Sequence, residues 1–195
     1  MARIPAKEKI LDTALGCFRA YGYPATSVDD IIAKAGVSKG SFYHAFKSKE
    51  DLGLAAIERY IDHLNAVLAQ GPHRDIPDPV PKALAFVDHV ADQAMEIWGQ
   101  GCLMGSFAVD LAHAQPRVQQ KLKSVFARLE QDLRTIFDPF AARLGAGAPS
   151  GAELARLFIT QVQGAIVLGH AHGDMALTRE TLRGFRRYLA SLARA

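Results

Sequence analysis

The stretch TSVDDIIAKAGVSKGSFYHAFKSKEDL, residues 26–52, decides how this chain folds. Ser27 stands three residues before Asp30, a spacing typical of the capping box that starts a helix. Gly36 is suited to end that helix, and Ser38 can cap a second short one. The apolar side chains that the first helix turns inward would be Ile31, Ile32 and Ala35.

The second helix has two faces of different chemistry. Phe42 and Phe46 are four residues apart, so both lie on the side that packs inward. A helix, a turn with glycine and a second helix form a helix-turn-helix arrangement, whose exposed donors suit DNA phosphates and base edges. From the residues alone, a packed helical pair with a solvated polar face is an equal alternative. The outward side chains are Lys39, Ser41, Tyr43 and His44, followed by Lys47 and Lys49.

The composition sets broad limits on the chain. With 195 residues it is long enough for one domain or two small ones, and 49% of its residues are hydrophobic. Its 23 Lys and Arg against 20 Asp and Glu give a net charge of +3, which does not by itself identify a nucleic-acid binder. Cys17 and Cys102 form neither a disulfide framework nor a paired-cysteine metal site. We find no export signal or membrane span in the sequence and expect a cytoplasmic protein.

Apolar residues recur every three or four positions along almost the whole chain. Residues 71–81 hold four prolines and are expected to be a turn or linker, and residues 145–151 a loop. Pro139 should kink or shorten the last turn of its helix. With no alternating strand pattern, the predicted fold class is all-α with about nine helices. Beyond the two short helices, the spacing predicts helices over residues 10–21, 52–68, 81–98, 102–112, 116–140, 153–173 and 178–194.

The run AYGYPATSVDDIIAKAGVSKGSFYHAFKSKEDL, residues 20–52, resembles the DNA-binding domain of the TetR family of transcriptional regulators. The resemblance implies a helix-turn-helix DNA-binding domain at residues 1–50 and a larger helical domain for effector binding and dimerisation at residues 51–195. The residues that it implies in or beside the major groove of double-stranded DNA are Lys39, Gly40, Ser41, Tyr43 and His44. Those that it implies at phosphates are Thr26, Ser27 and Lys49.

A small-molecule effector is expected between residues 71–81 and the helix that begins at Pro116. The apolar and aromatic residues of this region suit a small hydrophobic molecule. Most of them would be core in an ordinary helical domain, and composition does not separate the two interpretations. The candidate walls of the pocket are Phe86, His89, Met95, Trp98, Cys102, Met104, Phe107, Phe126 and Phe137.

The last two helices carry apolar stripes wider than one small core requires. We predict that they pair with a second copy into a four-helix bundle. Gly164 and Gly169 fit such an interface, because glycine inside a helix costs about 1 kcal/mol relative to alanine and is easier to explain where another backbone approaches. An ordinary core helix is the alternative. The predicted interface residues are Val162, Ala165, Ile166, Gly169, Leu182, Phe185, Leu189 and Leu192.

Cys102 stands at the start of a predicted helix, in the run GCLMGSF. Backbone N–H groups at a helix N-terminus can make a thiol more reactive, and Gly-Cys-Leu resembles a segment of TetR-family members that sense electrophiles. The alternative is a buried cysteine that acts as a small hydrophobe, which we also expect of Cys17. His170 and His172 lie about 200° apart on a helix and make a poor metal pair, so no metal and no other cofactor is expected.

These observations lead to the hypothesis of a homodimeric, ligand-responsive DNA-binding transcriptional regulator. As in most of the family, it would be a repressor that binds a pseudo-palindromic operator and is released by a small hydrophobic or electrophilic effector. An enzyme is not expected, because the sequence holds no nucleophile–base–acid set, carboxylate pair or phosphate-binding glycine loop. Two alternatives remain open: a thiol-dependent helical enzyme that uses Cys102, and a helical scaffold that binds protein.

Overall fold

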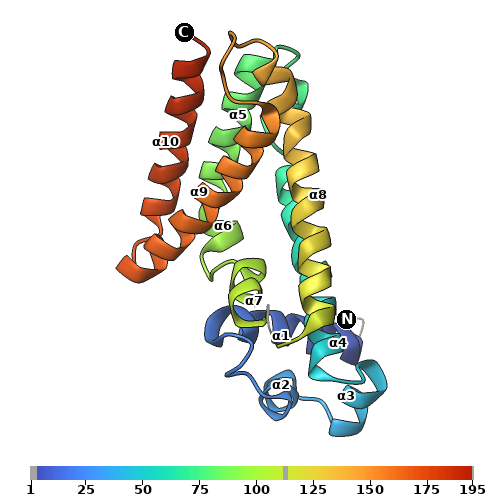
Figure 1. Cartoon of the computed structure of the whole chain (residues 1–195). Coiled ribbons are helices and arrows are strands. Elements are labelled where there is room, and N and C mark those ends of the chain that lie inside the picture. The colour runs from blue at the N-terminus through green and yellow to red at the C-terminus, as the bar shows by residue number, and fades with distance from the viewer. Residues whose placement is uncertain (1–3, 112–113, 195) are drawn as a thin grey trace. The chain divides into compact units, whose positions relative to one another are not determined.

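The computed structural model describes residues 4–111 and 114–194 (Figure 1). These residues form ten α-helices and one 3-10 turn, with no strand among them, which confirms the all-α class. The helix predicted over residues 81–98 is divided at Gln93, and this division accounts for the difference from nine helices. The elements are α1 (Ala6–Tyr21), α2 (Val28–Ala35), α3 (Lys39–Ala45), α4 (Lys49–Leu68), η1 (Pro72–Asp75), α5 (Pro79–Asp92), α6 (Ala94–Trp98), α7 (Leu103–Leu111), α8 (Pro116–Ala141), α9 (Gly151–His172) and α10 (Ala176–Leu192).

The predicted caps of α2 and α3 are both formed. The Asp30 backbone N–H donates to Ser27 Oγ at 3.1 Å, and the Ser27 N–H donates to Asp30 Oδ2 at 3.0 Å, which completes a capping box. Hydrogen bonds from the side chain and backbone of Ser27 lower the pKa of Asp30. Gly36 ends α2 with φ of +62°, a left-handed conformation that favours glycine. Ser38 Oγ accepts from the Ser41 N–H at 3.1 Å and starts α3.

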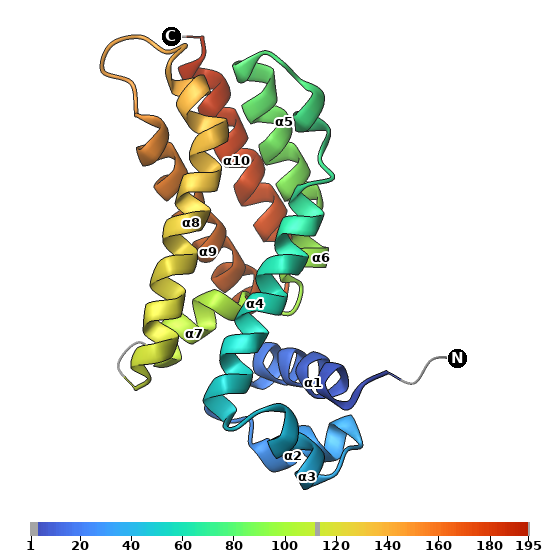
Figure 2. The same cartoon turned by 90° about the vertical axis from the view of Figure 1, so that its right-hand side faces the viewer.

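The chain divides into two compact units, of which the first comprises residues up to 63 and residues 100–123. Here α1 packs against both α2 and α3 (Figure 2). Phe18, Tyr23 and Phe107 form an aromatic triad with ring centroids 5.1 to 5.5 Å apart, and this triad joins α1 to α7. Arg59 of α4 pairs with Glu8 and Asp12 of α1. The helix-turn-helix is therefore held on a base made by its own unit.

The second unit comprises residues 64–99 and those from 124 onward. In it α10 packs on both α5 and α9. Four phenylalanines fill its core with ring centroids 5.3 to 6.2 Å apart. Burial of such rings is the main favourable contribution to folding here. The four are Phe86, Phe137, Phe158 and Phe185.

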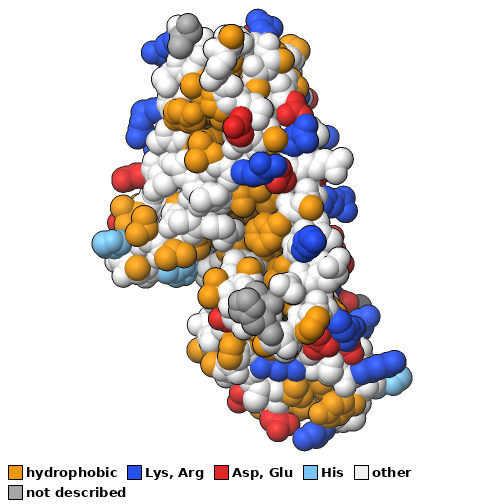
Figure 3. All heavy atoms as spheres, in the orientation of Figure 1, with side chains coloured by type: hydrophobic (Ala, Val, Ile, Leu, Met, Phe, Trp, Pro, Cys, Tyr) orange, Lys and Arg blue, Asp and Glu red, His pale blue; other side chains and the backbone are white. Residues whose placement is uncertain are grey.

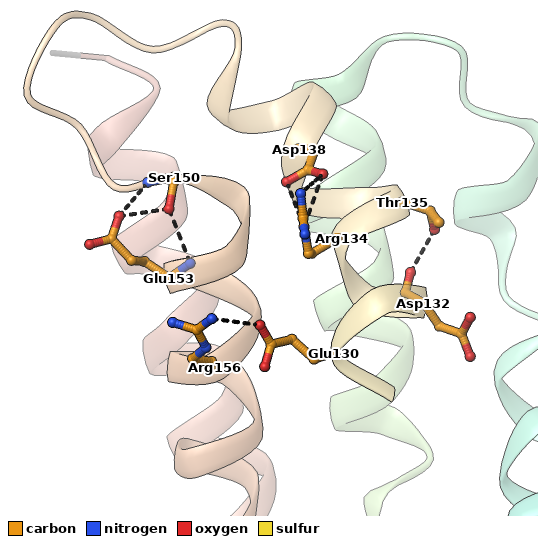
Figure 4. A network of polar contacts seen from close by, with 8 residues as sticks. All are labelled: Glu130, Asp132, Arg134, Thr135, Asp138, Ser150, Glu153 and Arg156. Atoms are coloured by element: carbon orange, nitrogen blue, oxygen red, sulfur yellow. Dashed lines mark hydrogen bonds and ion pairs between the residues drawn. The ribbon is translucent and has the colours of Figure 1, made fainter. Parts of the chain in front are cut away.

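Polar contacts join the second half of α8 to the first turns of α9 (Figure 4). Arg156 Nη2 lies 3.0 Å from Glu130 Oε1. Ser150 and Glu153 form a second capping box, in which the Ser150 N–H donates to Glu153 Oε2 at 2.8 Å. The hydrogen bonds from Ser150 lower the pKa of Glu153. The cap thus sets where α9 begins, and the ion pair links its first turns to α8.

The proline-containing segments are more helical than a linker or a helix end would be. The expected linker at residues 71–81 contains the turn η1 and the start of α5, because Pro79 takes the first helical position and Asp78 Oδ1 accepts from the Val80 N–H at 3.1 Å. Pro139 lies inside α8, which continues to Ala141, because a proline in the last turn removes only one hydrogen bond near the end. The predicted kink or shortening of that turn stays a prediction. The predicted end at residue 112 lies outside the described residues.

Within the parts of the chain that the structure covers, no helix combines the length and the apolar character needed to cross a membrane. The division into functional domains at residues 1–50 and 51–195 stays a prediction.

Candidate nucleic-acid interface

The exposed face of α3 is the candidate reading surface. Phe42 and Phe46 are buried beneath it, as their spacing predicted. Tyr43 is 51% exposed, although tyrosine is usually more buried, and His44 beside it is exposed as well. Lys39 and Gly40 are exposed at the start of the helix. In Figure 3, lysine and arginine side chains, with acidic ones beside them, gather over the surface where α3 and the start of α4 lie.

Lys39 is paired within the helix-turn-helix. Its Nζ lies 3.3 Å from Asp29 Oδ1 on α2, and both side chains are largely exposed. A surface pair of this kind contributes little to stability, on the order of 0 to 1 kcal/mol. It does place a carboxylate directly beside a lysine of the candidate reading surface.

Thr26 does not reach the surface. It is 2% exposed, and its hydroxyl donates to the carbonyl oxygen of Gly22 at 2.8 Å. The expectation that Thr26 contacts a phosphate is therefore not supported by its position: the side chain is used to close the turn between α1 and α2. A hydroxyl that satisfies a carbonyl at the end of a helix stabilises the entry to the helix-turn-helix.

Ser27 is exposed, but its hydroxyl already has a partner. Its Oγ donates to Asp30 Oδ2 at 2.6 Å while it accepts from the Asp30 N–H. A phosphate at this position would meet the ionised carboxylate of Asp30. The capping role of Ser27 is thus established by geometry, whereas a phosphate contact stays a prediction.

Lys49 at the start of α4 is half-buried. Its Nζ donates to the carbonyl oxygen of Tyr23 at 2.6 Å and lies 4.1 Å from the centroid of the Tyr23 ring. Burial lowers the pKa of the Lys49 ammonium. The side chain holds the α1–α2 turn against α4, and a phosphate contact would have to share an ammonium that is already engaged.

The nine candidate effector residues are divided between the two units. Cys102, Met104 and Phe107 belong to the first unit and the other six to the second, so the nine are not one cluster within either unit. Most are buried, but Met95 is 64% exposed. Phe107 is part of the aromatic triad with Phe18, which is a core role. The effector pocket stays a prediction.

Sequence reasoning missed His73, which lies in the segment taken for a linker. It is 6% exposed and its ring packs edge-on against Phe86 at 5.1 Å. Its Nδ1 has no hydrogen-bond partner among the described residues. Burial lowers the pKa of His73, and the nearby charges of His89, Lys82 and Arg74 lower it further. The prolines around it indicated a turn but gave no sign that the turn would be packed into the second unit.

The residues predicted at the dimer interface are largely core residues of a single chain. Leu182, Phe185 and Leu189 are at most 1% exposed and pack within the second unit. A Cβ added at Gly169 would come within 2.8 Å of Thr178 Oγ1, so the close approach at this glycine is made by the start of α10. Only Leu192 of the predicted set is partly exposed; the other buried members are Val162, Ala165 and Ile166.

The opposite face of α9 carries the exposed apolar groups. Leu157, Val167 and Leu168 are 43%, 66% and 52% exposed, and Gly164 between them is open, with no atom within 4 Å of an added Cβ. Tyr188 of α10 is also partly exposed. We call the four residues that belong to α9, namely Leu157, Gly164, Val167 and Leu168, the α9 outer face. The predicted interface residues are buried within the chain, and which face of α9 meets a partner stays a prediction.

Cys102 is buried just before α7 begins. Its carbonyl oxygen accepts from the Ser106 hydroxyl at 3.1 Å. Cys17 is buried in α1. Burial matches the interpretation of both cysteines as small hydrophobes, and the sensing role of Cys102 stays a prediction.

The geometry of α2 and α3 is that of a DNA-binding motif. A capped α2, a left-handed Gly36 and an α3 with a polar outer face on buried phenylalanines are the parts of a DNA-binding helix-turn-helix. The family model of bacterial regulatory proteins of the tetR family matches residues 10–56. The model of the LmrA/YxaF-like transcriptional regulator C-terminal domain matches residues 79–181. The chain belongs to the TetR family of transcriptional regulators.

Individual relatives agree with this assignment. The HTH-type transcriptional repressor DhaR of Mycobacterium sp. (strain GP1) is 30% identical over 176 residues, which cover 86% of this chain and 83% of DhaR. The uncharacterized HTH-type regulator YxaF of Bacillus subtilis is 27% identical over 175 residues, 89% of each chain. The crystal structure of regulatory protein TetR from Rhodobacter sphaeroides has the same fold, with a TM-score of 0.81 at 24% identity over 94% of this chain and 98% of that one. Regulators of this family bind DNA and small effectors as dimers.

Proposed function

We propose that this regulator is a cytoplasmic repressor that binds a pseudo-palindromic operator as a homodimer and leaves it when a small effector binds. The observation that carries the proposal is the exposed face of α3, with Tyr43, His44 and Lys39 beside one another on a buried phenylalanine base. The similarity to DhaR, a transcriptional repressor, supports repression as the mode of action.

In this proposal α3 enters the major groove of one half-site. Tyr43 and His44 supply hydrogen-bond donors and acceptors to base edges and phosphates, and Lys39 supplies a positive charge. Gly40 keeps the backbone of α3 close to the DNA. Two half-sites are read together only when the two copies of α3 are about 34 to 36 Å apart, or a multiple of that spacing.

The second copy is proposed to pack on the α9 outer face. A contiguous group of exposed apolar side chains on one helix is a typical interface feature. Gly164 at its centre leaves room for another backbone, and Leu157, Val167 and Leu168 surround it. The interface would be isologous, so that α9 of one protomer meets α9 of its partner.

The effector is proposed to be a small hydrophobic molecule, because the candidate walls are apolar and aromatic. Such a molecule can release the operator only if it binds more tightly to a dimer whose reading helices have the wrong spacing. Electrophilic effectors that modify Cys102 are a narrower version of the same proposal and require access to a buried thiol.

Footprinting tests the proposed function. The purified full chain is incubated with DNA from upstream of its own and adjoining genes, and a protected inverted repeat is expected. Tyr43→Ala should reduce the preference for that repeat over a scrambled duplex, whereas Tyr21→Ala, another exposed tyrosine of the same unit, should not. The absence of any protected repeat would remove the support for a repressor.

A further inference from the structure

Two grooves run along the junction between the first turn of α1 and α3. One, of about 480 Å³, is lined by Lys9 together with Ser38 and Ser41. The other, of about 600 Å³, is lined by Lys7 together with Ser41 and His44. Ala6 and Ser41 belong to both grooves, so the two are adjacent. The candidate reading surface therefore continues from α3 onto α1.

Basic and acidic side chains lie on different faces of this turn of α1. At about 100° per residue, Lys7 lies roughly 100° to one side of Ala6 and Lys9 roughly 60° to the other, while Glu8 lies roughly 200° away. The carboxylate of Glu8 is paired with Arg59 on α4, and so is that of Asp12. The acidic groups of α1 are thus neutralised on the far side, and lysines flank the side that faces α3.

Both lysines are exposed. Lys7 Nζ lies 5.9 Å from the centroid of the Phe46 ring, which keeps its stem against the base of α3. The structure gives Lys9 no acidic partner among the described residues. An exposed lysine in a groove that also presents hydroxyl groups is complementary to a phosphodiester oxygen.

We propose that the first turn of α1 is a second contact with the DNA, in which Lys9 and Lys7 bind backbone phosphates next to the base pairs that α3 reads. The inference rests on the proposed function, because the phosphates are those of the duplex held by α3. It assigns the α1 turn to affinity and to positioning along the duplex. Sequence discrimination stays with α3.

Salt dependence of binding tests this inference. Fluorescence anisotropy measures the affinity of the full chain between about 50 and about 300 mM salt. The two DNA ligands are an operator duplex and a scrambled duplex of equal length and composition. Each phosphate contact contributes about 0.9 to the slope of log affinity against log salt, so Lys9→Ala in both protomers of a dimer should reduce it by about 1.8. Lys7→Ala should act in the same direction, and Lys9→Arg should keep the slope of the parent.

Lys123→Ala is the matched control, because Lys123 is an exposed lysine of α8 in the same unit and lines neither groove. It removes the same charge and should leave the slope within error of the parent. The ratio of operator to scrambled affinity should be unchanged in Lys9→Ala. Circular dichroism should show equal helix content for all variants, since the substituted side chains are exposed.

The possible results are distinct. If Lys7→Ala and Lys9→Ala both behave like Lys123→Ala while Tyr43→Ala still loses operator preference, the contact by α1 is refuted and the proposed function stands. If Lys9→Ala reduces discrimination as much as affinity, α1 reads bases and the assignment to phosphates is wrong. If the parent shows no preference for any operator, the proposed function itself fails.

Discussion

The α2–α3 pair and the α9–α10 pair are both two-helix motifs, but their sequences are informative to different degrees. In α2–α3 the caps at Ser27 and Ser38 and the left-handed Gly36 fix where each helix begins and ends. In α9–α10 the apolar residues occupy two faces of α9, one buried within the chain and one exposed. Local hydrogen-bonding signals therefore determine the first motif, whereas the faces of the second depend on what packs against them.

The sharpest test of this comparison is a truncation in the core of the second unit. Phe185→Ala should cost about 3 to 5 kcal/mol of unfolding free energy, because it removes a ring from the four-phenylalanine cluster. Urea denaturation followed by circular dichroism measures the loss. Tyr188→Ala, on the exposed side of the same helix, should cost under about 1 kcal/mol. Equal losses would mean that the core and the outer face of α10 are wrongly assigned.

Introducing a charge on the α9 outer face should have the next largest effect, a loss of dimerisation. Leu168→Glu should weaken dimerisation by about 2 kcal/mol or more, because the carboxylate would be buried against the partner. Sedimentation velocity should show monomers at concentrations where the parent is dimeric. Val109→Glu introduces the same charge at another exposed apolar position, on α7, and should leave the dimer intact. A Leu168→Glu protein that dimerises like the parent would exclude this face.

A smaller loss is expected at the turn of the helix-turn-helix. Gly36→Ala should destabilise the chain by about 1 to 2 kcal/mol, since a side chain is disfavoured at φ of +62°. There is space for the methyl group, so the cost is one of backbone conformation alone. Gly145→Ala, in a loop without positive φ and with open space around it, should change the melting temperature little. No difference between the two variants would contradict the importance of the left-handed turn.

The smallest expected effect is a pH dependence from His73. Its pKa in the folded chain is lowered below the ordinary value of 6.5, chiefly by burial, so the unfolded chain binds more protons as the pH falls through that value. Stability should therefore decrease on acidification from pH 7 toward pH 5. His73→Gln should flatten that part of the stability profile, whereas His63→Gln, at an exposed histidine of α4, should not. A parallel profile for His73→Gln and the parent would show that another group causes the acid sensitivity.

Much of the fold could be predicted from the sequence because helices are specified locally. The caps at Ser27 and Ser38 and the inward spacing of Phe42 and Phe46 are fixed by residues within four positions of one another. Less of the candidate site could be predicted from the sequence. Exposure of Tyr43 follows from helical periodicity, but the burial of Thr26 depends on a carbonyl at the end of α1, and the engagement of Lys49 depends on the backbone of Tyr23.

Longer-range packing explains which structural features the sequence did not predict. The burial of His73 requires α5 to fold against its own preceding turn, and no periodic pattern in a proline-rich segment carries that information. The exposure of Leu168 and the burial of Ile166 on the same helix depend on where α10 lies. Amphipathic spacing identifies faces, and only tertiary contacts decide which neighbour each face receives.

The ion pair between Asp29 and Lys39 bears on the use of this protein as a genetic sensor. A lysine that already has a carboxylate beside it gains less from binding a phosphate. We therefore expect Asp29 to lower the affinity of α3 for DNA of unrelated sequence. Engineers who want a switch with low background occupancy should retain Asp29. Those who need stronger repression from a weak operator should replace Asp29 with asparagine and accept more binding to unrelated DNA.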